Sequence, residues 1–179
     1  MSHLPSLPPE TTLLDVFRAH PGPVGPLLEL HERVMRAESP LTPGQRELIA
    51  AYVSGLNGCG YCHGVHTATA EAFGVPAELL PAALADLDSA PVEGRMRPLL
   101  HYVRVLTLTP SRVAEDDAEA VYAAGWDERA LHDAIAVCAL FNYMNRVVEG
   151  AGIRADDAYA QLSGRRLRDI GYAGLAALL

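Results

Sequence analysis

The chain has 179 residues and a formal net charge of −8, with 22 acidic residues against 14 basic ones. Half of the residues are hydrophobic and only 6% are aromatic, so a sizeable core can form and must be filled mainly by Ala, Leu and Val. Every basic residue is an arginine, and the chain contains no lysine. This excludes a lysine Schiff base and a P-loop lysine, and the acidic balance argues against nucleic-acid binding.

The predicted elements are all helical, and we expect one all-α domain over residues 1–179, with a Pro-rich N-terminal arm at 1–12. No segment shows the alternation of polar and apolar residues that is typical of strands. Apolar spacing and capping residues predict helices over 13–18, 26–37, 43–56, 60–74, 76–86, 97–108, 111–125 (capped by Ser111), 127–150 and 156–170, followed by a short apolar tail.

The N-terminal residues lack the positive and apolar regions of a signal peptide. The two longest apolar stretches are either interrupted by polar residues or too short to span a bilayer. We therefore expect a cytoplasmic protein with no membrane-spanning segment.

The three cysteines, Cys59, Cys62 and Cys138, divide into a pair and a single residue. Their odd number argues against a secreted disulfide framework. Cys138 lies in the most apolar predicted helix, where a free cysteine packs as a small hydrophobic residue. Cys59 and Cys62 form a Cys-x-x-Cys motif where a helix is predicted to begin. The helix dipole and the unpaired N–H groups there are expected to lower the pKa of both thiols.

Two further residues in segment 47–66 could act on these thiols. His66 follows Cys62 by four residues, so the two side chains share one face of a helix, and an imidazole there can accept the thiol proton. Glu47 lies on the preceding predicted helix, and a turn at Asn57-Gly58 would fold it back toward that face. There it would orient the imidazole or relay its proton; alternatively, Glu47 serves only the dipole of its own helix.

These residues predict a dithiol redox centre. Cys62 would attack an oxidant such as a peroxide and become a sulfenic acid, and Cys59 would convert it into a disulfide that an external dithiol reduces. We expect no cofactor, because no Gly-x-Gly-x-x-Gly motif follows a strand, and no metal. The alternative from another class is a zinc- or thiol-based binding or sensor protein, with His63 and His66 as further zinc ligands.

The pattern Glu-x11-Cys-x2-Cys-x3-His resembles that of the AhpD-like alkyl hydroperoxidases in the carboxymuconolactone decarboxylase family. The resemblance covers about residues 30–87, and Phe141-Asn-Tyr-Met-Asn-Arg146 resembles a later helix of the peroxidase-related branch. It implies a single-domain AhpD-like helical bundle in which Cys62 is the peroxidatic cysteine and Cys59 the resolving one. His66 and Glu47 would then form the proton relay.

The resemblance also implies a hydroperoxide substrate, an external dithiol reductant and a homo-oligomer (dimer, trimer or hexamer). Tyr61 stands where the best-studied peroxidases of the group often have histidine, which is typical of the uncharacterised peroxidase-related branch. Tyr61 could pack over the disulfide or donate a hydrogen bond to a bound oxidant, which makes it a candidate for substrate binding. By the same resemblance, Asn142, Asn145 and Arg146 are further candidates. Decarboxylase members lack the cysteine pair, so lactone decarboxylation is not expected. A dithiol–disulfide reductase of a partner protein is a further alternative.

Overall fold

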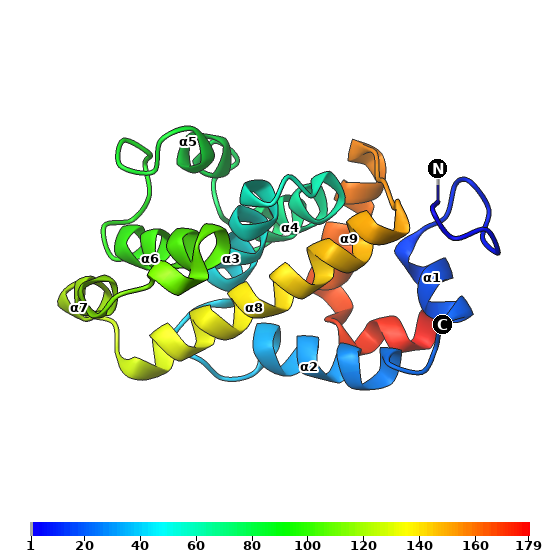
Figure 1. Ribbon diagram of the computed structural model, residues 1–179, viewed down its shortest axis with the longest axis horizontal. Coiled ribbons are helices and arrows are strands. Elements are labelled where there is room, and N and C mark those ends of the chain that lie inside the picture. Colours follow the sequence, from blue (N-terminus) through cyan, green and yellow to red (C-terminus); the bar gives the residue numbers. More distant parts are fainter. Residues whose placement is uncertain (1) are drawn as a thin grey trace.

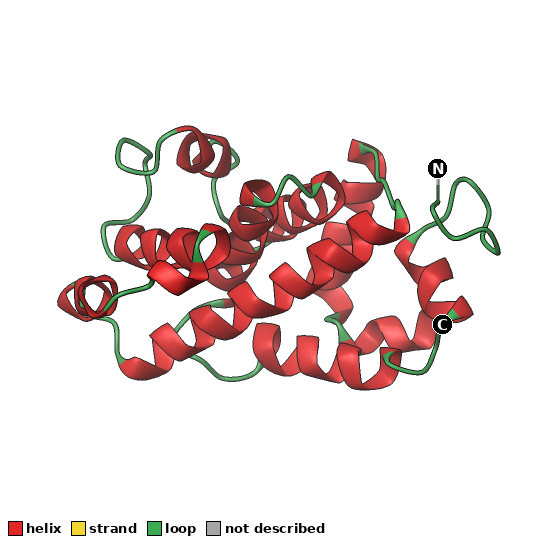
Figure 2. Cartoon of the chain, in the orientation of Figure 1, coloured by secondary structure: helices red, strands yellow, loops and turns green. Residues whose placement is uncertain are grey.

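The computed structural model describes residues 2–179, and over this range the chain forms helices without strands (Figures 1 and 2). The predicted all-α fold is confirmed. The helices are α1 (Leu13–Ala19), α2 (Val24–Arg36), α3 (Pro43–Leu56), α4 (Gly60–Ala72), α5 (Leu79–Ala85), α6 (Met96–Leu108), α7 (Glu115–Ala123), α8 (Glu128–Ala151) and α9 (Asp157–Ile170), with 3-10 helices η1 (Pro110–Arg112) and η2 (Ala173–Leu178).

Local capping residues mark the starts of several helices. The side chains of Thr42, Asp127 and Asp156 accept hydrogen bonds from backbone N–H groups at the starts of α3, α8 and α9. The prediction of a cap at Ser111 is wrong, because Ser111 lies in η1 and α7 begins at Glu115. There the carboxylate of Asp117 accepts a hydrogen bond from the backbone N–H of Ala114 instead.

A tight turn joins α3 to α4 and places the cysteine motif. Gly58 has a φ of 69°, a left-handed conformation that glycine adopts without strain. The backbone N–H of Cys59 then donates to the carbonyl oxygen of Ser54 at 2.9 Å. Cys59 is consequently the N-cap residue of α4, and Cys62 lies in its first turn. The two helices pack against each other, so the middle of α3 faces the first turns of α4.

Small residues let α9 pack directly on α4. A Cβ atom added at Gly164 would lie 2.7 Å from the backbone carbonyl carbon of Ala68, and one added at Gly64 would touch Ala160 at 3.5 Å. Only glycine at position 164 allows this approach without a shift of backbone. Figure 1 shows α9 beside α4 and next to the end of α8.

The long helix α8 crosses the molecule and carries much of the core (Figure 1). Cys138 is fully buried on it, as expected, and burial raises the pKa of its thiol. A second, smaller apolar cluster joins α1, α2 and α8 through Phe17, Val24, Leu28 and Met144. Within residues 2–179, no helix combines the length and the apolar character that crossing a membrane requires.

Candidate active site

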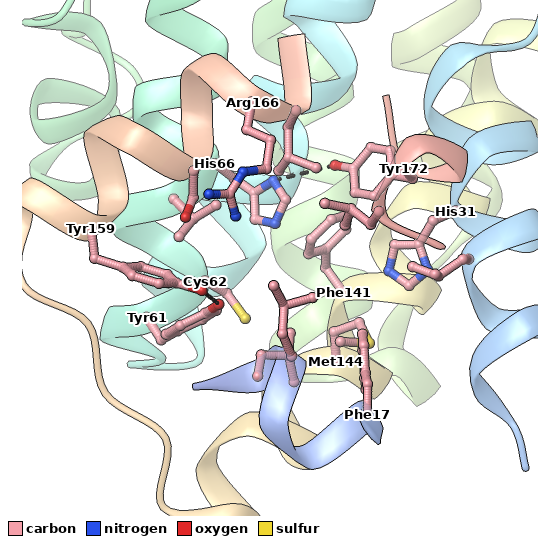
Figure 3. Close-up of a pocket in the computed structure, with 17 residues that line it drawn as sticks. Phe17, His31, Tyr61, Cys62, His66, Phe141, Met144, Tyr159, Arg166 and Tyr172 are labelled. Carbon is pink, nitrogen blue, oxygen red and sulfur yellow. Dashed lines mark hydrogen bonds between the residues drawn. The ribbon is translucent and has the colours of Figure 1, made fainter. Parts of the chain in front are cut away.

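A cavity of about 80 Å³ lies among α1, α2, α4, α8, α9 and the C-terminal segment (Figure 3). Leucine, valine, phenylalanine and methionine side chains form most of its surface. The lining also contains Cys62 and seven polar residues: His31, Tyr61, His66, Tyr159, Ser163, Arg166 and Tyr172. An apolar cavity with a few polar groups is the usual form of a small-molecule site.

The two motif cysteines are free thiols with different access to this cavity. Cys62 is among the lining residues, whereas Cys59 is fully buried and is not. A hydrogen bond from the Cys62 thiol, together with the Cys62 backbone N–H, lowers the pKa of Cys59. That same hydrogen bond, burial and the charge of Cys59 raise the pKa of Cys62 well above its ordinary value.

The thiolate is therefore favoured on Cys59 and the proton on Cys62. The expectation that the helix start lowers both pKa values is right for Cys59 and wrong for Cys62. The physical reason is the hydrogen bond that Cys62 makes to Cys59, followed by burial, which leaves Cys62 only 2% exposed, and by the charge of Cys59. Desolvation and a like charge both oppose a second thiolate.

Glu47 and His66 are in direct contact. His66 Nδ1 lies 2.7 Å from Glu47 Oε2, and both side chains are buried. The other carboxylate oxygen accepts hydrogen bonds from Arg36 at 2.6 Å and from the Tyr172 hydroxyl at 2.9 Å. The predicted approach of Glu47 to the histidine is thus present. Since its oxygens are engaged by these side chains, the interpretation of Glu47 as a partner of its own helix dipole has no support.

This arrangement fixes the chemistry of the imidazole. Burial raises the pKa of Glu47, but the hydrogen bond and charge of His66, followed by those of Arg36, outweigh it and leave the pKa below its ordinary value. The carboxylate is therefore ionised near neutral pH, and His66 donates through Nδ1. In the neutral ring, Nε2 is then the proton acceptor. His66 lines the same cavity as Cys62, and the hydrogen bonds found within residues 2–179 do not join the two side chains.

The four predicted substrate-binding residues lie in three different places. Tyr61 lines the cavity, and its hydroxyl lies 3.0 Å from that of Tyr159. Asn145 is buried outside the lining, where it donates to the Ser54 hydroxyl at 2.9 Å, and its side chain lowers the pKa of Cys62 in part. Asn142 and Arg146 are not lining residues; Arg146 donates to the carbonyl oxygen of Asn142 at 2.6 Å.

No group of three or more His, Cys, Asp or Glu residues in the described chain is placed to hold a metal ion. His63, a possible fourth zinc ligand in the sequence, lies with its Nδ1 3.0 Å from the carbonyl oxygen of Ala51. The zinc alternative therefore has no support from the arrangement of these side chains.

Sequence reasoning missed several site residues, which come from distant parts of the chain. Arg36 and Tyr172 complete the shell around Glu47, and Tyr172 belongs to the segment predicted only as an apolar tail. His31 lines the cavity with its Nδ1 2.7 Å from the carbonyl oxygen of Leu27, and burial lowers its pKa to about 4. No local spacing connects these residues to the cysteine motif, so no sequence signal marks them.

Comparison with known proteins agrees with the motif. Residues 26–103 match the carboxymuconolactone decarboxylase family. The chain is also similar to an uncharacterised peroxidase-related protein from Silicibacter sp. (25% identity, TM-score 0.76, covering 83% of this chain and 78% of that one). An uncharacterised peroxidase-related protein from Ralstonia eutropha, described as an alkylhydroperoxidase AhpD core, gives 25% identity and a TM-score of 0.76, with 84% and 78% coverage.

A protein of unknown function from Agrobacterium tumefaciens shares the fold at 19% identity, with a TM-score of 0.71 and coverage of 82% of this chain and 99% of that one. A search of curated proteins found no match. The matched residues include Glu47, both motif cysteines and His66. The chain therefore has an AhpD-like helical fold, and its residues 26–103 are similar to the carboxymuconolactone decarboxylase family.

Proposed function

We propose that this protein is a thiol peroxidase that reduces hydroperoxides, with Cys62 as the peroxidatic cysteine and Cys59 as the resolving one. The observation that carries the proposal is the shared cavity of Cys62 and His66, with Glu47 hydrogen-bonded behind the imidazole. Cys59 contacts Cys62 from the side that is closed to the cavity. Only one of the two sulfurs can therefore meet a bound peroxide.

In the first step, the sulfur of Cys62 attacks one peroxide oxygen and the O–O bond breaks. The thiol proton passes to His66 Nε2 and from there to the leaving alkoxide, so the products are a sulfenic acid and an alcohol. Glu47 and Tyr172 hold the imidazole in the tautomer that this transfer needs. Because the pKa of Cys62 is raised, its attack depends on a base in the cavity.

In the second step, the Cys59 thiolate attacks the sulfur of the sulfenic acid. A disulfide forms, hydroxide leaves, and a proton from solvent or His66 converts it into water. The lowered pKa of Cys59 suits this step, since the attacking group must be a thiolate. An external dithiol would then supply the two electrons that reduce the disulfide. This reductant, a homo-oligomeric assembly and a cytoplasmic location stay predictions.

The burial of both sulfurs disfavours reduction of a partner protein's disulfide. Cys59 is 0% exposed and Cys62 is 2% exposed, so a folded partner protein cannot contact either sulfur directly, and the external dithiol of the proposed cycle has to reach Cys62 through the cavity. A small hydroperoxide that enters the cavity avoids this restriction.

The test is a thiol count before and after a single equivalent of a short-chain alkyl hydroperoxide such as ethyl hydroperoxide. We expect the wild type to lose both motif thiols and to retain Cys138, and Cys138→Ser to react like the wild type. Cys59→Ser should accumulate a sulfenic acid that dimedone traps on Cys62. If Cys62→Ser consumes the hydroperoxide as fast as the wild type, the assignment is wrong.

A further inference from the structure

We propose that the cavity binds organic hydroperoxides that carry a carboxylate, with Arg166 and Ser163 as the carboxylate-binding residues. The inference rests on the proposed function and narrows its substrate class. It starts from two polar side chains of α9 that line the cavity and that the peroxidase chemistry does not use.

Arg166 is the only arginine of the cavity lining, which contains no aspartate or glutamate. Its side chain extends from α9 toward the cavity (Figure 3). The ion pairs found within residues 2–179 do not include Arg166. By contrast, Arg36, the other arginine near this site, is paired with Glu47. Arg166 thus brings an uncompensated positive charge to a largely apolar chamber.

Ser163 lies three residues before Arg166, so the two side chains occupy the same face of α9. Ser163 is 7% exposed and lines the cavity, yet its hydroxyl oxygen has no hydrogen-bond partner. A buried polar group without a partner is costly unless a ligand or water supplies the bond. A carboxylate between the two side chains would accept from the guanidinium and from this hydroxyl.

The other polar groups of the lining are not available to bind a carboxylate. His31 is neutral near pH 7, because burial lowers its pKa to about 4. Tyr61 and Tyr159 hydrogen-bond to each other, and Tyr172 donates to Glu47. The charge of Arg166 also acts at Tyr61, where it partly offsets the raised pKa that burial causes. Arg166 is therefore close to the residue that precedes Cys62.

The size of the cavity limits the apolar part of the substrate. Its volume of about 80 Å³ is roughly half that of an engineered apolar cavity of about 150 Å³ that binds benzene. We therefore expect a short aliphatic chain between the hydroperoxide at Cys62 and the carboxylate at Arg166.

The first measurement uses no peroxide. Alkylation of Cys62 by N-ethylmaleimide is followed by mass spectrometry in the presence of hexanoate or 1-hexanol. In the wild type, hexanoate should protect Cys62 at a concentration about tenfold lower than hexanol, the factor expected for one charge-assisted hydrogen bond. Arg166→Gln should remove this difference. The matched control is Arg165→Gln, which loses the same charge from an exposed neighbouring position and should keep it.

The second measurement compares the rates of reduction of a hydroperoxyhexanoic acid and its methyl ester. The wild type should prefer the acid in kcat/KM by about tenfold or more, and the ratio should approach one in Arg166→Gln. Equal protection by hexanoate and hexanol in the wild type, or loss of the preference in Arg165→Gln, overturns the inference. Turnover of both hydroperoxides without a preference would overturn it and leave the peroxidase proposal standing. If hexanoate protects Cys62 in an Arg166-dependent way but no hydroperoxide is turned over, the peroxidase proposal fails and the carboxylate-binding site stands.

Discussion

The substitution Glu47→Gln tests the buried network on which the proposed chemistry depends. The amide keeps the shape of the side chain and can still accept from Arg36 and Tyr172. Its nitrogen, however, would face the Nδ1–H of His66, where the carboxylate oxygen now accepts at 2.7 Å. To avoid two opposed donors, the imidazole must move its proton to Nε2, and the nitrogen left for the cavity is no longer a base.

The expected cost can be worked out from burial. The Glu47 side chain is 0% exposed and that of Arg36 is 12% exposed, and removing one partner of a buried ion pair costs about 3–5 kcal/mol. Because the amide keeps some hydrogen bonds, we expect the lower end, about 3 kcal/mol, or a fall in Tm of about 6–12 °C for a chain of this size. Since the free energy of unfolding of a domain is usually about 5–15 kcal/mol, the Glu47→Gln protein should still fold.

The assay combines urea unfolding with the rate of Cys62 oxidation by ethyl hydroperoxide. Loss of the general base should slow oxidation by about 100-fold or more. The matched control is Glu29→Gln, which removes a carboxylate from an exposed pair with Arg33 and should change little. An unchanged oxidation rate in a folded Glu47→Gln protein would refute the relay, and an unchanged stability would refute the buried pairing.

Three further predictions concern pH and packing. The pKa of Glu47 in the folded protein lies below its ordinary value of 4.5, so the carboxylate stabilises the fold fully above pH 4.5; the stability advantage of the wild type over Glu47→Gln should shrink as pH falls below this value, as followed by urea unfolding. Gly164→Ala should lower the free energy of unfolding by about 1–3 kcal/mol, because its Cβ would lie 2.7 Å from the backbone of α4. Gly150→Ala, with open space around it, should leave the stability unchanged or raise it by up to about 1 kcal/mol. Equal shifts in Tm for the two variants would contradict this. Tyr172→Phe deletes one hydrogen bond to the carboxylate and should cost about 1.5–3 kcal/mol, against no measurable loss in the exposed control Tyr143→Phe.

The parts of the structure that sequence could predict are those that short-range rules determine. The caps at Thr42, Asp127 and Asp156 act within three residues of the helix starts that they mark. The contact between Glu47 and His66 also followed from sequence, because one tight turn between two helices brings them together.

Properties that depend on tertiary burial could not be predicted in this way. Tyr172 donates to Glu47 across 125 positions of the chain, and no periodicity spans that distance. The direction of the Cys62 pKa depends on how deeply the side chain is buried and on which of two sulfurs holds the charge. The hydrogen bond to Cys59, burial and the charge of Cys59 raise this pKa, and none of them can be predicted from the position of Cys62 at a helix start.

The close packing of α9 on α4 has a consequence for how substrate selectivity could change. Gly164 fixes the spacing of two helices, one of which carries Cys62 and the other Arg166. For the proposed substrates, the distance between the Cys62 thiol and the Arg166 guanidinium would therefore set the preferred length of the chain that joins the hydroperoxide to the carboxylate. On the α1 side, the cavity is lined by the apolar side chains of Leu13 and Phe17. Substitutions there should alter the tolerated width of a substrate, while its preferred length stays the same.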